Sequence, residues 1–321
     1  MGSTNYGIVT RFDLRSYELL PGTVCGGIHF YGIDQLGYVA KILVDFTKQP
    51  PQTPSVFAAG IGWNPEHNVY GTLHSYTHNC EPGSDDLFSW VRTQFAPLST
   101  QGFTDKGPRS GLHDISDTFR NILFPGGVRQ SWQTITFRNA DAVLIADVFQ
   151  MMEQTFKSLH DDGIHDAITI QPFTSRQLIS GQGEAGYPTT LSDEDDELVS
   201  TSPSSFLMVT LIAFLVFLLI VEWKDAAHDD LVKEVGRGLL KDMENLARKR
   251  DMLHPWIYMN YADSYQEVFQ RSVTREDLAR MVEIRKRYDS EDFFARYWRG
   301  GFKLPRTEEE TYEDSTWRDE L

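Results

Sequence analysis

The segment FLMVTLIAFLVFLLIV, residues 206–221, decides the fold, because its long apolar run contains a single polar side chain, Thr210. As a helix it would be about 24 Å long, which is shorter than the roughly 30 Å hydrocarbon core of a bilayer. Its flanks carry one lysine and no basic cluster that would set an orientation in a membrane. A buried strand with an adjoining hydrophobic insertion is therefore favoured, and a membrane anchor stays open as the alternative.

Outward from this segment, strand patterns alternate with helical ones. Alternating or apolar runs predict strands at 24–31, 55–63, 68–77, 130–137 and 165–173. Apolar residues at helical spacing predict helices at 36–46, 140–159 and 229–250, and Thr274 with Asp277 resembles a capping box. This pattern indicates an α+β fold: an antiparallel sheet with helices packed on one face, which leaves the other face available for a ligand.

The composition excludes some classes of partner. The 30 basic and 46 acidic residues give a net charge of −16, which would repel nucleic acid and anionic membranes. Cys25 and Cys80 allow one disulfide but form no CxxC pair, so the cellular compartment stays unknown. The histidines show no metal-ligand spacing, and we expect no metal site.

Three groups of motifs carry a family resemblance. Near the C-terminus stand PWIYMNYAD (255–263), LARMVEIRKRYDSEDFF (278–294) and GGFKL (300–304). Near the N-terminus stands NYGIVTRFDL (5–14), and Gln171-Pro172 lies between the two ends. In this order the motifs resemble those of berberine-bridge-enzyme-like FAD-linked oxidoreductases of the fungal type, and the resemblance spans nearly the whole chain.

The resemblance implies FAD as the cofactor and assigns roles to particular residues. Tyr258 is the candidate catalytic base, which a phenol can be only if its pKa is depressed. The candidate cofactor-binding residues are Asn5, Tyr6, Gly7, Ile8, Val9, Asn260 and Tyr261. We expect 255–263 to be a strand, which would place Tyr258 and Asn260 on one face. Plain strand core remains the alternative for Ile8 and Val9, and Glu222 is interpreted as a carboxylate at the edge of the core.

The sequence also departs from this family. It lacks the glycine-rich pyrophosphate loop and the histidine, often accompanied by a cysteine, that the family uses to hold or attach its flavin. We therefore expect weak FAD binding by this chain alone, with a missing FAD-binding domain as a possible partner. The expected organisation is a remnant of that domain (1–20), a substrate domain (21–250) with an insertion near 192–214, a berberine-bridge-like segment (251–305) and an acidic tail (306–321).

Three functions follow from these observations. The leading hypothesis is an FAD-linked oxidoreductase, or a truncated member, that oxidises a small organic molecule of secondary metabolism by hydride transfer to flavin. The second is a flavin-free domain that binds a small molecule or steers a cyclisation. The third is a single-pass membrane-anchored protein with residues 206–221 as its span.

Overall fold

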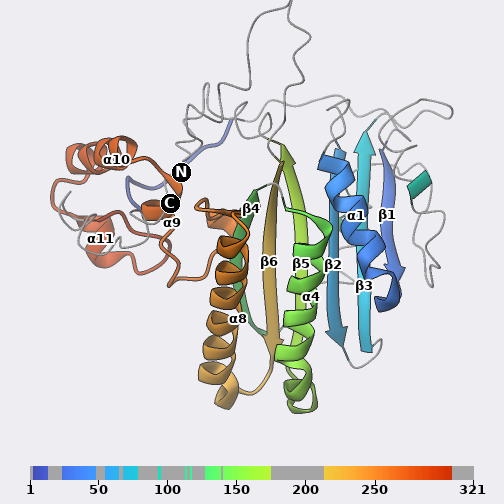
Figure 1. Ribbon diagram of the computed structural model, residues 1–321. Coiled ribbons are helices and arrows are strands. Elements are labelled where there is room, and N and C mark those ends of the chain that lie inside the picture. The colour runs from blue at the N-terminus through green and yellow to red at the C-terminus, as the bar shows by residue number, and fades with distance from the viewer. Residues whose placement is uncertain are drawn as a thin grey trace, which may run out of the picture. The chain divides into compact units, whose positions relative to one another are not determined.

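The computed structural model describes residues 3–13, 24–47, 55–64, 68–78, 93–94, 113, 116–117, 127–138, 140–174 and 213–305 (Figure 1). The chain divides into two compact units. The sheet unit comprises Tyr17–Thr174 and Ala213–Leu253. The terminal unit comprises Met1–Ser16, Ser175–Ile212 and His254–Leu321, so it joins the two ends of the chain. The predicted insertion near 192–214 and the acidic tail lie almost wholly outside the described residues, as does Cys80.

The sheet has seven strands in the order β1-β3-β2-β5-β6-β4-β7. The long strands are antiparallel to their neighbours: β1 (Val24–Tyr31), β2 (Ser55–Asn64), β3 (Asn68–His78), β4 (Arg129–Arg138), β5 (His165–Thr174) and β6 (Ala213–Trp223). The short β7 (Leu253–His254) lies at the edge beside β4. All five strands that the alternation predicts are confirmed within a residue or two.

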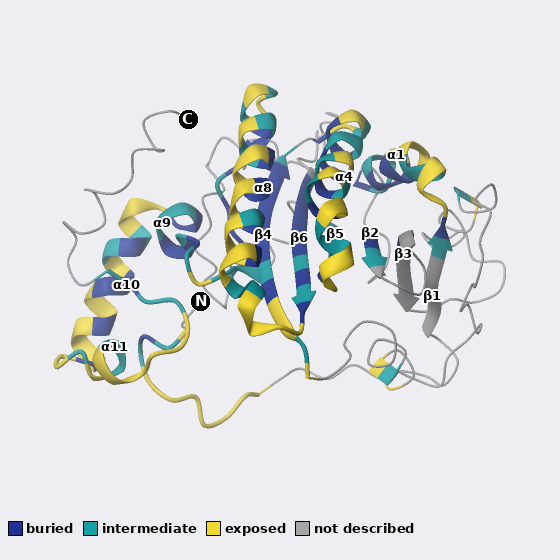
Figure 2. Cartoon of the chain, turned by 90° about the horizontal axis from the view of Figure 1, so that it is seen from below, coloured by how far each residue is buried: buried dark blue, intermediate teal, exposed yellow. Residues whose placement is uncertain are grey.

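Three helices cover one face of this sheet (Figures 1 and 2): α1 (Leu36–Thr47), α4 (Ala142–Phe156) and α8 (Asp229–Lys249). Each buries an apolar stripe and turns its exposed residues away from the sheet, as Figure 2 shows. The 3₁₀ turns are η1 (Ile33–Gln35), η2 (Lys157–Asp162) and η3 (Ala226–His228). The predicted α+β architecture is confirmed; the long helix predicted for 140–159 is shorter because its last turn tightens into η2.

The apolar run that decides the fold is a strand over its described part. β6 pairs with β4 from Phe214 to Trp223 and with β5 from Ala213 to Glu222. Its residues 214–219 are buried, as expected for a central strand with both faces covered. No helix among the described residues is long and apolar enough to cross a membrane. The membrane-anchor hypothesis is therefore wrong for 213–221, and residues 206–212 lie outside the described part.

One glycine leaves room for an aromatic ring of the neighbouring strand. Tyr31 of β1 is directly opposite Gly71 of β3, and a Cβ atom at Gly71 would lie 2.1 Å from the tyrosine ring. The Tyr31 hydroxyl donates a hydrogen bond of 2.8 Å to the carbonyl oxygen of Gly60 in β2. Burial raises the pKa of Tyr31 far above its ordinary value, so the phenol remains a donor.

The terminal unit has short helices around a core of its own. They are η4 (Met259–Tyr261), α9 (Val268–Ser272), α10 (Arg275–Tyr288) and α11 (Phe293–Tyr297). Thr274 caps α10 by accepting a 3.1 Å hydrogen bond from the Asp277 amide, which confirms the capping signal in the sequence. The core consists of buried apolar side chains from α9, α10 and the C-terminal segment: Phe269, Val273, Leu278, Met281, Val282 and Leu304.

Candidate functional site

The buried side-chain amide of Asn5 connects the N-terminal motif to the GGFKL segment. Asn5 is only 2% exposed. Its Nδ2 donates 2.9 Å to the Phe302 carbonyl, and its Oδ1 accepts 2.8 Å from the Leu304 amide. This pair of bonds imitates one rung of a β-ladder, so the side chain joins segments from opposite ends of the chain. The geometry gives Asn5 a positioning role, which the resemblance alone did not reveal.

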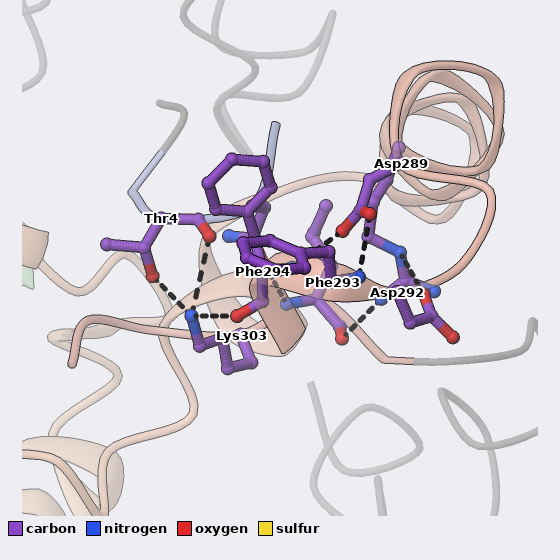
Figure 3. Close-up of polar contacts among 9 residues, drawn as sticks. Thr4, Asp289, Asp292, Phe293, Phe294 and Lys303 are labelled. Atoms are coloured by element: carbon purple, nitrogen blue, oxygen red, sulfur yellow. Dashed lines mark hydrogen bonds and ion pairs between the residues drawn. The ribbon is translucent and has the colours of Figure 1, made fainter. Parts of the chain in front are cut away.

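Lys303 makes a second connection between the same segments (Figure 3). Its ammonium group donates to the side chain of Thr4 at 2.5 Å and to the carbonyl of Phe294 at 3.1 Å. Desolvation lowers the pKa of Lys303. Beside it, both oxygens of Asp289 accept hydrogen bonds from the amides that begin α11, those of Phe293 and Phe294. Together these bonds hold α11 next to Thr4.

The residues that follow Asn5 present apolar side chains to solvent. Ile8 and Val9 are 68% and 64% exposed, so the strand-core alternative for them is wrong. A Cβ atom added at Gly7 would meet no atom within 4 Å. Large exposed apolar side chains beside an open glycine are characteristic of a surface that a ligand or another domain covers. The position fits the contact with a cofactor that the resemblance implies.

The Y-x-N-Y motif does not form the predicted strand. Residues Met259–Tyr261 form the 3₁₀ turn η4, with Tyr258 at its N-cap. The alternation argument for this segment is therefore wrong, but the turn still brings the two polar groups together. The Asn260 side-chain amide donates a 3.0 Å hydrogen bond to the Tyr258 hydroxyl. Because that bond occupies an acceptor site on the phenol oxygen, the Tyr258 proton is directed elsewhere.

The two motifs share one core. Tyr6, next to Asn5, and Met259, between Tyr258 and Asn260, both pack against the apolar cluster of the terminal unit. Burial raises the pKa of Tyr6, and the nearby Arg285 opposes that shift. Burial also raises the pKa of Tyr261, whose ring lies 4.7 Å from that of Tyr258 in a T-shaped contact. The terminal unit therefore places segments of both motifs on one core, and Tyr6 and Tyr261 stay protonated there.

The sheet unit contributes titratable groups of its own. Glu222, near the end of β6, is half-buried and accepts a hydrogen bond from Gln130 of β4. Burial raises the pKa of Glu222. At the same end of the sheet, the His160 Nε2 lies 2.6 Å from Asp166, and the indole of Trp63 stacks on the His160 ring. Burial raises the pKa of Asp166 to about 6, and His160 partly offsets this rise.

Among the described residues, no group of three potential ligands could hold a metal ion. The contacts of Lys303 and Asn5 were missed by sequence reasoning, although the GGFKL motif was a signal for the lysine. The pair formed by His160 and Asp166 was missed too. Their environment depends on how neighbouring strands are aligned, and the residue pattern of a single strand does not indicate that alignment.

No known protein-family profile matches the chain. In sequence it is 25% identical over 313 residues to the FAD-dependent monooxygenase tpcD of Cochliobolus heterostrophus, covering 94% of this chain and 56% of that protein. An FAD-dependent monooxygenase of Fusarium proliferatum, FUP4, is 24% identical over 317 residues, with the same coverage. The chain thus spans little more than half the length of the curated relatives it matches, and those relatives are named for their dependence on FAD.

The chain is also similar in fold to several enzymes of known structure. With 6-hydroxy-D-nicotine oxidase of Arthrobacter nicotinovorans the TM-score is 0.64 at 14% identity, covering 95% of this chain and 59% of that one. With GilR, an oxidoreductase of gilvocarcin biosynthesis, it is 0.55 at 13% identity, covering 90% and 60%. Berberine bridge enzyme follows at 0.50 and 9%, covering 89% and 55%. The chain therefore has a fold in common with these three enzymes, across more than half the length of each.

Proposed function

We propose that this chain is the substrate-binding portion of an FAD-linked oxidoreductase that oxidises a small organic molecule, a secondary metabolite, by hydride transfer to flavin. The observation that carries the proposal is the alignment of 94% of the chain with an FAD-dependent monooxygenase. The fold it has in common with 6-hydroxy-D-nicotine oxidase supports the same class of chemistry. The role of GilR in gilvocarcin biosynthesis supports a biosynthetic substrate.

The described residues would suit contact with one side of a bound flavin and would not enclose it. Exposed Ile8 and Val9 next to the open Gly7 suit an apolar contact with a ring system. Asn260, which is exposed, and the Tyr258 hydroxyl to which it donates supply polar groups at the ring edge. Asn5 holds this segment in place, because its amide is already bonded to the backbone of Phe302 and Leu304. When bound, the flavin supplies the hydride acceptor.

Tyr258 is the residue we propose to handle a proton during the oxidation. Its hydroxyl accepts from Asn260, and its ring is fixed edge-on against Tyr261. A fixed phenol can exchange a proton with a substrate hydroxyl only if that hydroxyl comes within hydrogen-bond distance. Replacing Tyr258 with Phe should then lower kcat more than it raises KM, whereas replacing the exposed Tyr288 with Phe, the matched control, should change kcat little.

A flavin-binding domain is the partner we propose. Affinity for FAD comes from many contacts, with the pyrophosphate prominent among them. The purified chain should therefore take up FAD weakly, and co-expression with the unmatched portion of the relative tpcD should give a yellow complex with flavin absorbance. A complex that stays colourless after soaking with FAD, in the presence of that domain, contradicts the proposal.

The flavin-free hypothesis predicts a different result from the same preparations. A small molecule would then bind to the chain, or be converted, with equal efficiency whether or not flavin is added. Calorimetry with and without FAD separates the two functions. We favour the flavin-linked function because the two relatives that match 94% of this chain are named FAD-dependent monooxygenases.

A further inference from the structure

The end of α10 and the whole of α11 expose large aromatic side chains. The four most exposed of them, at 69%, 55%, 72% and 47%, are Tyr288, Phe293, Tyr297 and Trp298. Within α11, the rings of Phe293 and Tyr297 lie 5.2 Å apart. The Asp289 carboxylate accepts the amides that begin α11, so α11 starts directly beside the end of α10 (Figure 3). Exposed aromatic groups gathered in this way are characteristic of a surface that another segment covers.

The same stretch of the terminal unit is positively charged. Between 284 and 299 the exposed charged side chains are four basic ones and one acidic one: Lys286, Arg287, Arg296, Arg299 and Glu291. The Arg287 guanidinium lies 5.7 Å from the centre of the Tyr288 ring, so charge and aromatic surface are neighbours. We call residues 284–299 the aromatic-basic surface. In a chain with a net charge of −16, such a region should attract an acidic group.

An acidic segment of the chain starts next to this surface. Residues 306–321 lie outside the described part and contain seven acidic and two basic residues, together with two aromatic ones, Tyr312 and Trp317. They follow the buried Leu304, whose carbonyl accepts a 3.0 Å hydrogen bond from Arg285 of α10. Four residues of extended chain span at most about 14 Å. Glu308 is therefore within reach of the basic side chains that follow Arg285 in α10.

We propose that the acidic segment 306–321 binds to the aromatic-basic surface of its own chain. The glutamate carboxylates pair with Lys286 and Arg287, and the rings of Tyr312 and Trp317 stack on the exposed aromatic side chains. A single exposed ion pair contributes little, so the binding depends on several charges together. Attachment beside the surface gives the segment an effective concentration of about millimolar, as for a short linker. This inference is independent of the proposed function, because it involves no flavin.

Hydroxyl-radical footprinting, read by mass spectrometry, measures how accessible each side chain is in the full chain. Tyr38 of the sheet unit is the reference, since it is a tyrosine and is 36% exposed. An open surface would let Tyr297, at 72%, oxidise about twice as fast as Tyr38, which is the ratio of the two exposed fractions. If the acidic segment covers the surface, Tyr297 should oxidise no faster than Tyr38.

Charge substitutions on both sides of the contact test the proposed occupant. Neutralising the segment with Glu308→Gln, Glu309→Gln and Glu310→Gln should raise the Tyr297 rate to about twice that of Tyr38, the ratio of the exposed fractions. Lys286→Gln combined with Arg287→Gln should have the same effect from the other side. The matched control changes the charge equally in another acidic run, with Asp193→Asn, Asp195→Asn and Asp196→Asn, and should leave Tyr297 protected.

The remaining outcomes overturn the inference and name another occupant. A Tyr297 rate already twice that of Tyr38 in the unaltered chain means that the surface is open, and protection that appears only with an added flavin-binding domain assigns it to that domain. Protection that survives the glutamate substitutions and rises with protein concentration assigns it to a second copy of the chain. Protection that is lost in the aspartate control assigns it to the acidic run 193–197.

Discussion

Different kinds of interaction stabilise the sheet unit and the terminal unit, each within itself. In the sheet unit, long strands pair residue by residue, and the Phe137 and Phe217 rings meet at 4.4 Å in a fully buried core. In the terminal unit, side chains bond to the backbone of distant segments: Asn5 to Leu304, and the buried Arg285 to the Leu304 carbonyl at 3.0 Å. The sheet unit thus depends on many similar apolar contacts, whereas the terminal unit adds to its smaller apolar core a few polar bonds between distant segments.

The largest expected effect is on the sheet core. Phe217→Ala should lower the free energy of unfolding by about 4 kcal/mol, because it removes a buried ring and leaves a cavity against Phe137. The measurement is equilibrium urea unfolding, followed by circular dichroism. Phe12→Ala is the control, since Phe12 is 78% exposed in the terminal unit and its loss should change stability little. Equal effects of the two substitutions would remove the distinction between the units.

The second-largest expected effect is a dependence of stability on pH, which should come from Asp166 in the sheet unit. The pKa of Asp166 is about 6 in the folded state, above its ordinary value of 3.8. The native state therefore retains a proton that the unfolded chain has lost, and this contribution is fully present below about pH 4 and lost as pH rises through about 6. The loss should be on the order of 3 kcal/mol.

Thermal unfolding at pH values from 4 to 7 measures this slope. Asp166→Asn should flatten it, because the amide does not titrate, whereas Asp162→Asn, an exposed neighbour, should leave it as it is. A slope that persists in Asp166→Asn would assign the effect to another group.

Substitution at Asn5 tests the terminal unit directly. Asn5→Ala removes two buried hydrogen bonds and should cost about 2 kcal/mol, since the Leu304 amide and the Phe302 carbonyl lose their partners. Hydrogen exchange of the Leu304 amide should accelerate, while amides of β6 keep their protection. The exposed Thr10→Ala is the control. Equal acceleration in β6 would mean that the two units unfold together.

The smallest effect concerns the helix cap of α10. Thr274→Ala should lower stability by about 1 kcal/mol, because the Asp277 amide loses its acceptor. Thr274→Ser keeps an oxygen at the same position and should be nearly neutral. Thermal unfolding of the three proteins checks this ranking, and a loss in the serine variant equal to that in alanine would show that the methyl group, not the cap, matters.

Much of the sheet unit could be predicted from the sequence, because its patterns are local. The strands from 24 to 173 alternate or run apolar, and the helix at 229–250 has a continuous apolar stripe, so each element can be recognised from a few neighbouring residues. β6 was harder, since an apolar run has no periodicity. Its length against a bilayer favoured the strand, and pairing with β4 and β5 confirmed it over 213–223.

The candidate site could be predicted only in part. The resemblance selected Asn5, Tyr258 and Asn260, and the terminal unit does place their segments on one core. It did not predict the 3₁₀ turn at Tyr258 or the bonds that occupy Asn5, because both arise from packing against segments distant in sequence. The exposure of Ile8 and Val9 is likewise a property of the folded unit and has no signature in the residue pattern.

By itself, the sequence determined the type and order of the main elements and the cap at Thr274, because these depend on side chains within a few residues of one another. Tertiary structure alone decided that Asn5 forms hydrogen bonds through both its Nδ2 and its Oδ1, that Ile8 is exposed, and that the Thr134 hydroxyl donates to the Phe217 carbonyl. The reason is physical: a hydrogen bond or a buried surface requires two groups to meet, and only folding brings groups from distant segments together.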